Sequence, residues 1–240
     1  MLMYLKRIFD DLAYGEFSNM ALSKSPNGSI KQEDYPKVVS YINQALVDIF
    51  TRFLLKKKEF KLHQREDRSL YYIREDNVGD PNIGDPNIYI DGTEPDCIDG
   101  DIIKPIEAYD SLGEEVRINN GAYPDDIFTL EFDVFKIAPR DPLEVFSIVY
   151  QAAHEDIVIE EGFDPTTYEI YIPRYLKTAL LANLTARLYR GKTGKVAEGQ
   201  QNLANTYLYR YEQEMSRIED LGLTQEVIEE NENFDNGGFP

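Results

Sequence analysis

The chain has 240 residues, of which 42% are apolar and 12% aromatic, enough for a sizeable core in one domain or two small ones. This composition excludes the disordered class for most of the chain, and no apolar stretch reaches the roughly 20 residues of a membrane span. The net charge of −19 disfavours proteins that grip nucleic acid or an anionic membrane surface, because both bind through cations.

Residues 1–68 are predicted to be helical and carry a net charge of +3. A short helix is expected over Tyr4–Tyr14. A longer helix is expected to begin at Asp34 and to run to Lys56–Lys58, where cations favour a helix C-terminus. Its apolar residues recur at steps of three and four, which places them on one face: Val39, Ile42, Leu46, Ile49 and Phe53.

Residues 69–172 carry a net charge of −20 and consist of short β-branched or aromatic runs separated by Asp-Gly, Leu-Gly and Asn-Gly turns. The stretch Ile127–Ile137 alternates well enough to predict one strand with two distinct faces. We expect an antiparallel sheet with one buried face and one wet face that holds the acids. The expected strands are Leu70–Arg74, Asn87–Asp91, Ile102–Tyr109, Val116–Ile118, Ile127–Ile137, Val145–Tyr150 and Asp156–Glu160.

The five residues Gly-Asp-Pro-Asn-Ile occur twice in succession, at Gly79–Ile83 and Gly84–Ile88. The favoured interpretation is a duplicated turn at a hairpin tip. The alternative is a calcium site, because aspartates are dense over residues 76–101 and calcium prefers oxygen ligands. The spacing matches no EF-hand loop.

A second pair of helices is predicted in the last third of the chain. The first opens at Pro173 and carries Leu176, Leu180, Leu184 and Leu188 at steps of four. The next helix ends near Gly222, a suitable residue for a helix C-terminus, and the short connection predicts antiparallel packing. Residues 223–240 contain five acidic residues and no Lys or Arg. We expect them to be a flexible acidic tail.

These elements predict an α+β fold. Residues 1–68 and 173–222 are expected to form a discontinuous helical bundle, residues 69–172 an inserted acidic antiparallel β domain, and residues 223–240 the tail.

The sequence contains no constellation that predicts catalysis, a cofactor or a metal centre. Cys97 is the single cysteine, and only His63 and His154 could serve as imidazole ligands or bases. We therefore expect a protein that is not an enzyme. Lys56, Lys57 and Lys58 begin the one basic cluster, which either ends a helix or docks onto an acidic surface or a phosphate backbone.

Three stretches resemble a known family. Asp34–Phe53, with Tyr41-Ile-Asn-Gln-Ala-Leu46 and the aromatic Phe50 and Phe53, is similar to the first long helix of bacteriophage head-to-tail adaptor proteins of short-tailed phages. Residues 168–182, from Tyr-Glu-Ile-Tyr-Ile-Pro onward, resemble the strand-to-helix entry of that family, and Tyr207–Leu221 resembles its C-terminal helix. The resemblance covers most of the chain in layout.

This resemblance implies a structural subunit of a virion ring, typically of twelve copies, that joins the portal protein to a downstream tail or nozzle protein. Genomic DNA would pass through the lumen without specific binding, and the ring would be assembled in the bacterial host cytoplasm. Lys56, Lys57, Lys58, Phe234 and Phe239 are the candidate partner-binding residues. The alternative function is a calcium- or carbohydrate-binding β module on a helical scaffold.

Overall fold

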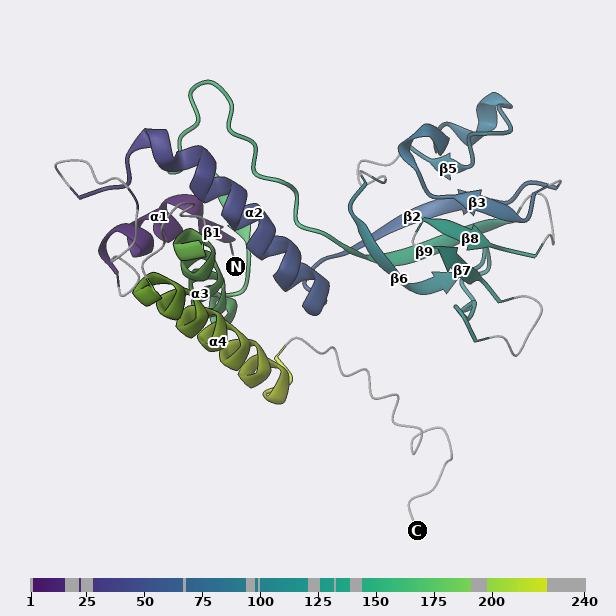
Figure 1. Ribbon diagram of the computed structural model, residues 1–240. Coiled ribbons are helices and arrows are strands. Elements are labelled where there is room, and N and C mark those ends of the chain that lie inside the picture. Colours follow the sequence, from purple (N-terminus) through teal and green to yellow (C-terminus); the bar gives the residue numbers. More distant parts are fainter. Residues whose placement is uncertain are drawn as a thin grey trace, which may run out of the picture. The chain divides into compact units, whose positions relative to one another are not determined.

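The computed structural model describes residues 2–15, 22, 28–66, 68–93, 98, 100–120, 126–131, 133–138, 144–190 and 198–223. The fold is mixed α+β, as predicted (Figure 1). The chain divides into unit 1, Met1–Val38 with Phe163–Pro240, and unit 2, Val39–Gly162. These boundaries lie at residues 38 and 162, whereas the sequence placed them near residues 68 and 172.

Unit 1 holds a two-stranded antiparallel sheet and most of the helical residues. Strand β1 pairs with β10, and the buried Met3 lies opposite the buried Ile170. Helix α1 buries one face, and its Asp11 forms an ion pair with Lys177 at the start of α3. The elements are β1 (Leu2–Tyr4), α1 (Leu5–Tyr14), β10 (Glu169–Tyr171), α3 (Lys177–Arg190) and α4 (Glu198–Asp220), with 3₁₀ turns at Gln32–Asp34 and Arg174–Leu176.

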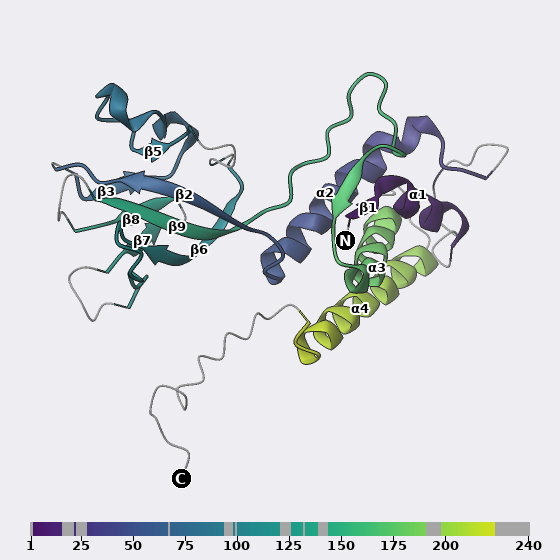
Figure 2. The ribbon, with the colours of Figure 1, turned by 180° about the vertical axis from the view of Figure 1, so that it is seen from behind.

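Helices α3 and α4 pack against each other and run antiparallel (Figures 1 and 2). The ring of Tyr189, late in α3, stacks on Tyr207, early in α4, with 6.0 Å between ring centroids. At the opposite end, the Tyr175 hydroxyl donates to the Leu223 carbonyl at 3.1 Å. Gly222 has the positive φ of 62° that suits the end of a helix. The predicted antiparallel pair is therefore present.

Helix α2 (Tyr35–Arg52) passes from unit 1 into unit 2 and buries the predicted apolar stripe. Its end is held by unit 2, because the Gln151 side-chain amide donates to the Phe53 carbonyl at 3.0 Å and also to that of Phe50. Such carbonyls have no partner within the helix. The side chain of Asn43 binds both backbone groups of Ile157, at 3.0 and 3.1 Å, and fixes the segment that follows the sheet.

Besides most of α2, unit 2 contains two sheets. The five-stranded sheet has the order β4-β5-β2-β9-β6 and the three-stranded sheet the order β3-β8-β7. All pairs are antiparallel except β4–β5. The strands are β2 (Lys57–His63), β3 (Leu70–Tyr72), β4 (Val78–Gly79), β5 (Ile90–Asp91), β6 (Ile102–Tyr109), β7 (Phe128–Glu131), β8 (Val134–Lys136) and β9 (Val145–Ala152), with 3₁₀ turns at Glu75–Asn77 and Pro81–Ile83.

The two sheets face each other across one apolar core. Phe60 of β2 stacks on Phe135 of β8, with ring centroids 6.4 Å apart, and also packs against Tyr150 of β9. The Tyr71 hydroxyl accepts from the Arg65 backbone at 2.9 Å, and the Tyr89 hydroxyl donates to the Tyr72 carbonyl at 2.9 Å. Aromatic rings thus fill the core while their hydroxyls are satisfied at its rim.

Five local predictions are wrong. The long helix ends at Arg52, and Lys57 and Lys58 lie in strand β2. The expected single strand Ile127–Ile137 is the hairpin β7–β8. Asp156–Glu160 forms no strand, and residues 116–118 contribute only an isolated bridge at Ile118. The repeated sequence joins two parallel strands and is not a hairpin tip.

Candidate functional site

The lysines that the sequence singled out lie at the start of β2, and each forms an ion pair. Lys56 Nζ lies 2.9 Å from Glu155, and Lys57 Nζ lies 3.3 Å from Glu107. Lys58 Nζ lies 2.8 Å from Asp101. We call these three residues the lysine row. Docking through the row would require each lysine to exchange a carboxylate of its own chain for one of a partner.

Lys58 differs from its neighbours because it points toward the core. The register places it opposite Tyr150, on the face that also holds Phe60. The Lys58 and Asp101 side chains are only 12% and 7% exposed, and the Tyr150 hydroxyl donates to Asp101 at 3.0 Å. Removing two charges from water is costly, so this pair depends on the close contact and the added hydrogen bond.

Lys57 lies on the opposite face of the same strand. Its partner Glu107 also accepts a hydrogen bond from the Tyr109 hydroxyl at 2.8 Å. That hydrogen bond, together with Lys57, holds the pKa of Glu107 below its usual range. Lys56 has the same effect on the pKa of Glu155. Both carboxylates are therefore charged at neutral pH and neutralise the cations beside them.

The repeated loop uses its two aspartates as turn caps. The backbone N–H of Asn82 donates to Asp80 at 2.9 Å, and that of Asn87 donates to Asp85 at 2.8 Å. Each copy of the repeat thus forms the same Asx turn. Arg65 holds both copies, because its guanidinium donates to the carbonyl of Pro81 at 3.0 Å and to that of Ile88.

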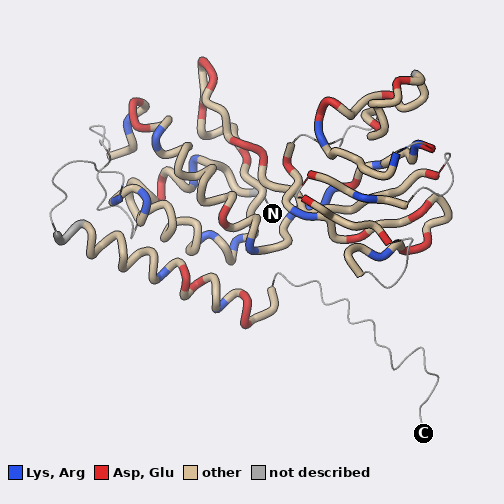
Figure 3. Tube along the Cα trace, turned by 45° about the vertical axis from the view of Figure 1, so that its right-hand side comes forward, with Lys and Arg blue, Asp and Glu red and all other residues tan. Residues whose placement is uncertain are grey.

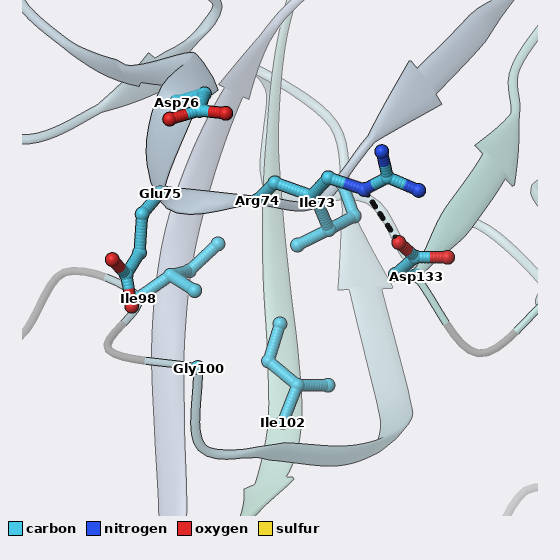
Figure 4. Close-up of a pocket in the computed structure, with 8 residues that line it drawn as sticks. All are labelled: Ile73, Arg74, Glu75, Asp76, Ile98, Gly100, Ile102 and Asp133. Carbon is cyan, nitrogen blue, oxygen red and sulfur yellow. Dashed lines mark hydrogen bonds and ion pairs between the residues drawn. The ribbon is translucent and has the colours of Figure 1, made fainter.

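A cavity of about 350 Å³ opens in unit 2 beside Arg74 (Figure 4). Its volume falls at the lower end of the range of small-molecule sites. Three isoleucines supply apolar walls, and charged side chains lie around them. The lining residues are Ile73, Arg74, Glu75, Asp76, Ile98, Gly100, Ile102 and Asp133.

Arg74 and Asp133 form the best-defined polar contact of the cavity. Arg74 Nε donates to Asp133 Oδ2 at 2.7 Å, and the terminal nitrogens of Arg74 point away from that carboxylate (Figure 4). The hydrogen bond from Arg74 to Asp133 raises the pKa of Arg74. The guanidinium lies 5.0 Å from the centre of the Tyr72 ring. The cavity can therefore offer donors, carboxylates and an apolar wall to a small polar group.

Burial lowers the pKa of both histidines, so each is neutral at pH 7. His154 meets the edge of Phe50, with 5.3 Å between ring centroids, and its Nδ1 lies 2.5 Å from the Glu155 carbonyl. Among the described residues, no three His, Cys, Asp or Glu side chains gather as a metal site requires. No helix in the described ranges is long and apolar enough to cross a membrane.

Several predicted residues lie outside the described part of the chain. These include the partner-binding candidates Phe234 and Phe239, and also Cys97.

The sequence reasoning missed Asp101, Arg74 and Asp133 as partners in ion pairs. The alternation Lys58, Phe60, Leu62 was the available signal for β2, but the adjacent helix pattern obscured it.

No model of a known protein family matches the chain, and a search of curated proteins finds no match. The resemblance to adaptor proteins therefore depends on the layout of the elements, and the function drawn from it is a proposal.

Proposed function

We propose that this chain is a structural, non-catalytic subunit of a virion ring that joins the portal to the tail of a short-tailed bacteriophage. The proposal is supported by the layout, in which an acidic β unit lies between helical segments, and by the resemblance of those segments to head-to-tail adaptors. In this proposal the helices of unit 1 form the bundle that contacts the portal. A tail or nozzle protein follows below, and about twelve copies would close the ring.

The observation that carries the proposal is that the lysines of the lysine row are paired with carboxylates of their own unit, which is acidic overall. Unit 2 has 12 Lys and Arg against 27 Asp and Glu, a net charge of −15. Acidic residues occur along its strands and turns (Figure 3), and the lysine row is paired with carboxylates. DNA affinity grows with each phosphate that a cation neutralises. A conduit through which DNA must slide benefits from cations that are already paired.

Helix α4 offers a surface for contact between copies. It buries one stripe against the rest of unit 1, while Leu203 and Tyr209 remain 44% and 66% exposed. Large apolar and tyrosine side chains of this kind are common at interfaces between proteins. We assign the contact between neighbouring copies to this exposed side of α4.

The test is electron microscopy and native mass spectrometry of the full chain, alone and mixed with the portal protein from the same genome. We expect class averages of a closed ring with a central hole. Tyr209→Glu is expected to abolish the ring, whereas Gln32→Glu, which adds the same charge to an exposed position of unit 1 outside α4, is expected to leave it intact. Monomers alone in the presence of the portal would contradict the proposal.

A second candidate function is favoured by the cavity beside Arg74. Its donors, carboxylates and apolar wall suit the hydroxyl groups of a carbohydrate, whereas Glu75 and Asp76 alone supply few of the oxygen ligands that a calcium ion takes. Calorimetric titration of the full chain with calcium and with monosaccharides tests this alternative. An absence of heat, with no shift in melting temperature, would dismiss it.

A further inference from the structure

The outer face of the three-stranded sheet in unit 2 is apolar. Tyr71 and Phe135 of this sheet point into the core that it shares with the five-stranded sheet. The residues between them in the alternation therefore face the other way. The pairing register brings Leu70, Lys136 and Phe128 into one row across the three strands.

A β-bulge adds a further apolar side chain to this face. The register shifts between Thr129 and Glu131, so both Leu130 and Glu131 lie opposite Val134. Leu130 is 56% exposed, and Leu70 and Tyr72 are 39% and 42% exposed. We call Leu70, Tyr72, Phe128 and Leu130, which surround the buried Val134, the outer patch. Exposed apolar groups that gather on one face typically mark an interaction site.

Charges of both signs lie beside the outer patch: Arg74, which pairs with Asp133, and Lys136 are positive, and Glu131 is negative. Arg74 continues the alternation of β3 beyond Tyr72, and its guanidinium lies over the Tyr72 ring. Lys136 lies on the patch face, and Glu131 is the acid opposite Val134. At physiological ionic strength charges are screened beyond about 8 Å. A ligand on the patch would therefore experience these nearby groups more strongly than the net charge of the unit.

A segment of this chain has the complementary composition. Residues 224–240 contain five acids, no base, and the apolar residues Val227, Ile228, Phe234 and Phe239. We propose that residues 224–240 of one copy dock on the outer patch of a neighbouring copy, with the phenylalanines on the apolar side chains and the acids beside Arg74 and Lys136. Extended, 17 residues span up to about 60 Å, which is enough to reach a neighbour.

The choice of a neighbouring copy rests on the proposed ring. In a ring every segment 224–240 has a patch nearby at a fixed spacing, so the effective concentration is high even when each contact is weak. The docking would then fasten adjacent subunits to each other.

The test is site-specific photo-crosslinking between two co-expressed forms of the full chain. The first form carries benzoylphenylalanine at Leu130 together with Phe234→Ser and Phe239→Ser, and the second carries the natural Leu130 and the intact segment. Light is expected to join position 130 to the intact peptide of residues 224–240. That product can form only between copies, because the probe and the intact segment are on different chains. The mass of the intact peptide distinguishes it from the peptide with the serine substitutions.

Two controls accompany this measurement. The first places benzoylphenylalanine at Leu112, which is 83% exposed in the turn after β6, and is expected to give only background. In the second, both forms carry the serine substitutions, and the crosslink is expected to fall about tenfold, as when aromatic anchors are lost from an interface.

Two results would overturn the inference. One is a crosslink from position 130 that avoids residues 224–240. The other is the absence of any crosslink between position 130 of the first form and the intact residues 224–240 of the second form. The ring itself is judged separately by microscopy. A ring without the crosslink would reject only the docking, and a crosslinked pair without a ring would reject the adaptor function.

Discussion

At the scale of single residues, two adjacent lysines of β2 have different energetic roles. Lys57 and its partner Glu107 are each about 30% exposed, at 30% and 28%, so water screens their attraction. Lys58 and Asp101 are almost withdrawn from water, and both Lys58 and the Tyr150 hydroxyl contact the Asp101 carboxylate. The alternation of a strand places neighbouring side chains on opposite faces, which accounts for the difference.

We expect Lys58→Ala to destabilise the protein by about 3–5 kcal/mol, the cost of leaving one member of a buried ion pair uncompensated. The matched change Lys57→Ala on the next residue should cost at most about 1 kcal/mol, the range of surface pairs. Urea denaturation followed by circular dichroism measures both. The double variant Lys58→Ala with Asp101→Ala should lose less stability than the sum of the single changes. Equal losses for the two lysine variants would show that burial does not distinguish the pairs.

At the scale of elements, one arginine organises the repeated loop. Each copy of Gly-Asp-Pro-Asn-Ile closes its own Asx turn, and the Arg65 guanidinium, placed just after β2, binds carbonyls in both. Strands β4 and β5 are only two residues long, so their pairing supplies little stability alone. We infer that Arg65 holds this edge of the five-stranded sheet in place.

Replacing Arg65 with alanine should loosen the edge of the sheet without unfolding unit 2. Hydrogen bonds from a charged donor contribute about 1.5–3 kcal/mol, so exchange of the amides of Ile88, Tyr89 and Gly92 should accelerate at least about tenfold. Hydrogen–deuterium exchange with mass spectrometry measures this. The control is Lys104→Ala, which removes an exposed cation from β6 on the far side of the same sheet. Unchanged exchange over residues 85–92 would refute the role of Arg65.

Elements with an unambiguous period were predictable from the sequence. The helices α1, α3 and α4 and the strand Ile102–Tyr109 were all expected, because their apolar spacing admits one interpretation. The C-terminal end of α2 was not predictable from the sequence. Lys56–Lys58 suits a helix end by charge, but the side chain of Gln151, about a hundred residues later, binds the last carbonyls and ends the helix earlier. No local pattern carries that long-range contact.

The hairpin β7–β8 and the site contacts were missed for related reasons. The alternation over Ile127–Ile137 is the same for one long strand and for two short ones. The bulge at Leu130 changes the side of the sheet on which the following side chains lie, and the composition gives no sign of it. The lysine row was identified by its charge alone. Its partners Glu107, Asp101 and Glu155 lie 43 to 99 residues away, and carboxylates are so abundant that the sequence could not select them.

At the scale of the whole molecule, the charge is unevenly divided. Unit 1 has 13 Lys and Arg against 17 Asp and Glu, a net charge of −4, whereas unit 2 carries −15. The weak DNA binding that we propose would have one of two explanations. Either the net charge repels the duplex, or the pairing of individual cations removes the groups that would hold phosphates. The two can be separated because Glu107 and Glu155 pair with the lysine row, whereas Glu114 and Glu115 lie in the turn after β6.

The double variant Glu107→Gln with Glu155→Gln should remove the charged partners that Lys57 and Lys56 have in these two residues, while shifting the net charge by two. The matched variant Glu114→Gln with Glu115→Gln makes the same shift in the turn after β6, away from the lysine row. Fluorescence anisotropy with a labelled 30-base-pair duplex at low salt compares them with the natural chain. If pairing decides, only the first variant binds DNA more tightly, and its affinity falls more steeply with salt because each new phosphate contact adds about 0.9 to the logarithmic slope. An equal gain in both variants would assign the effect to net charge alone.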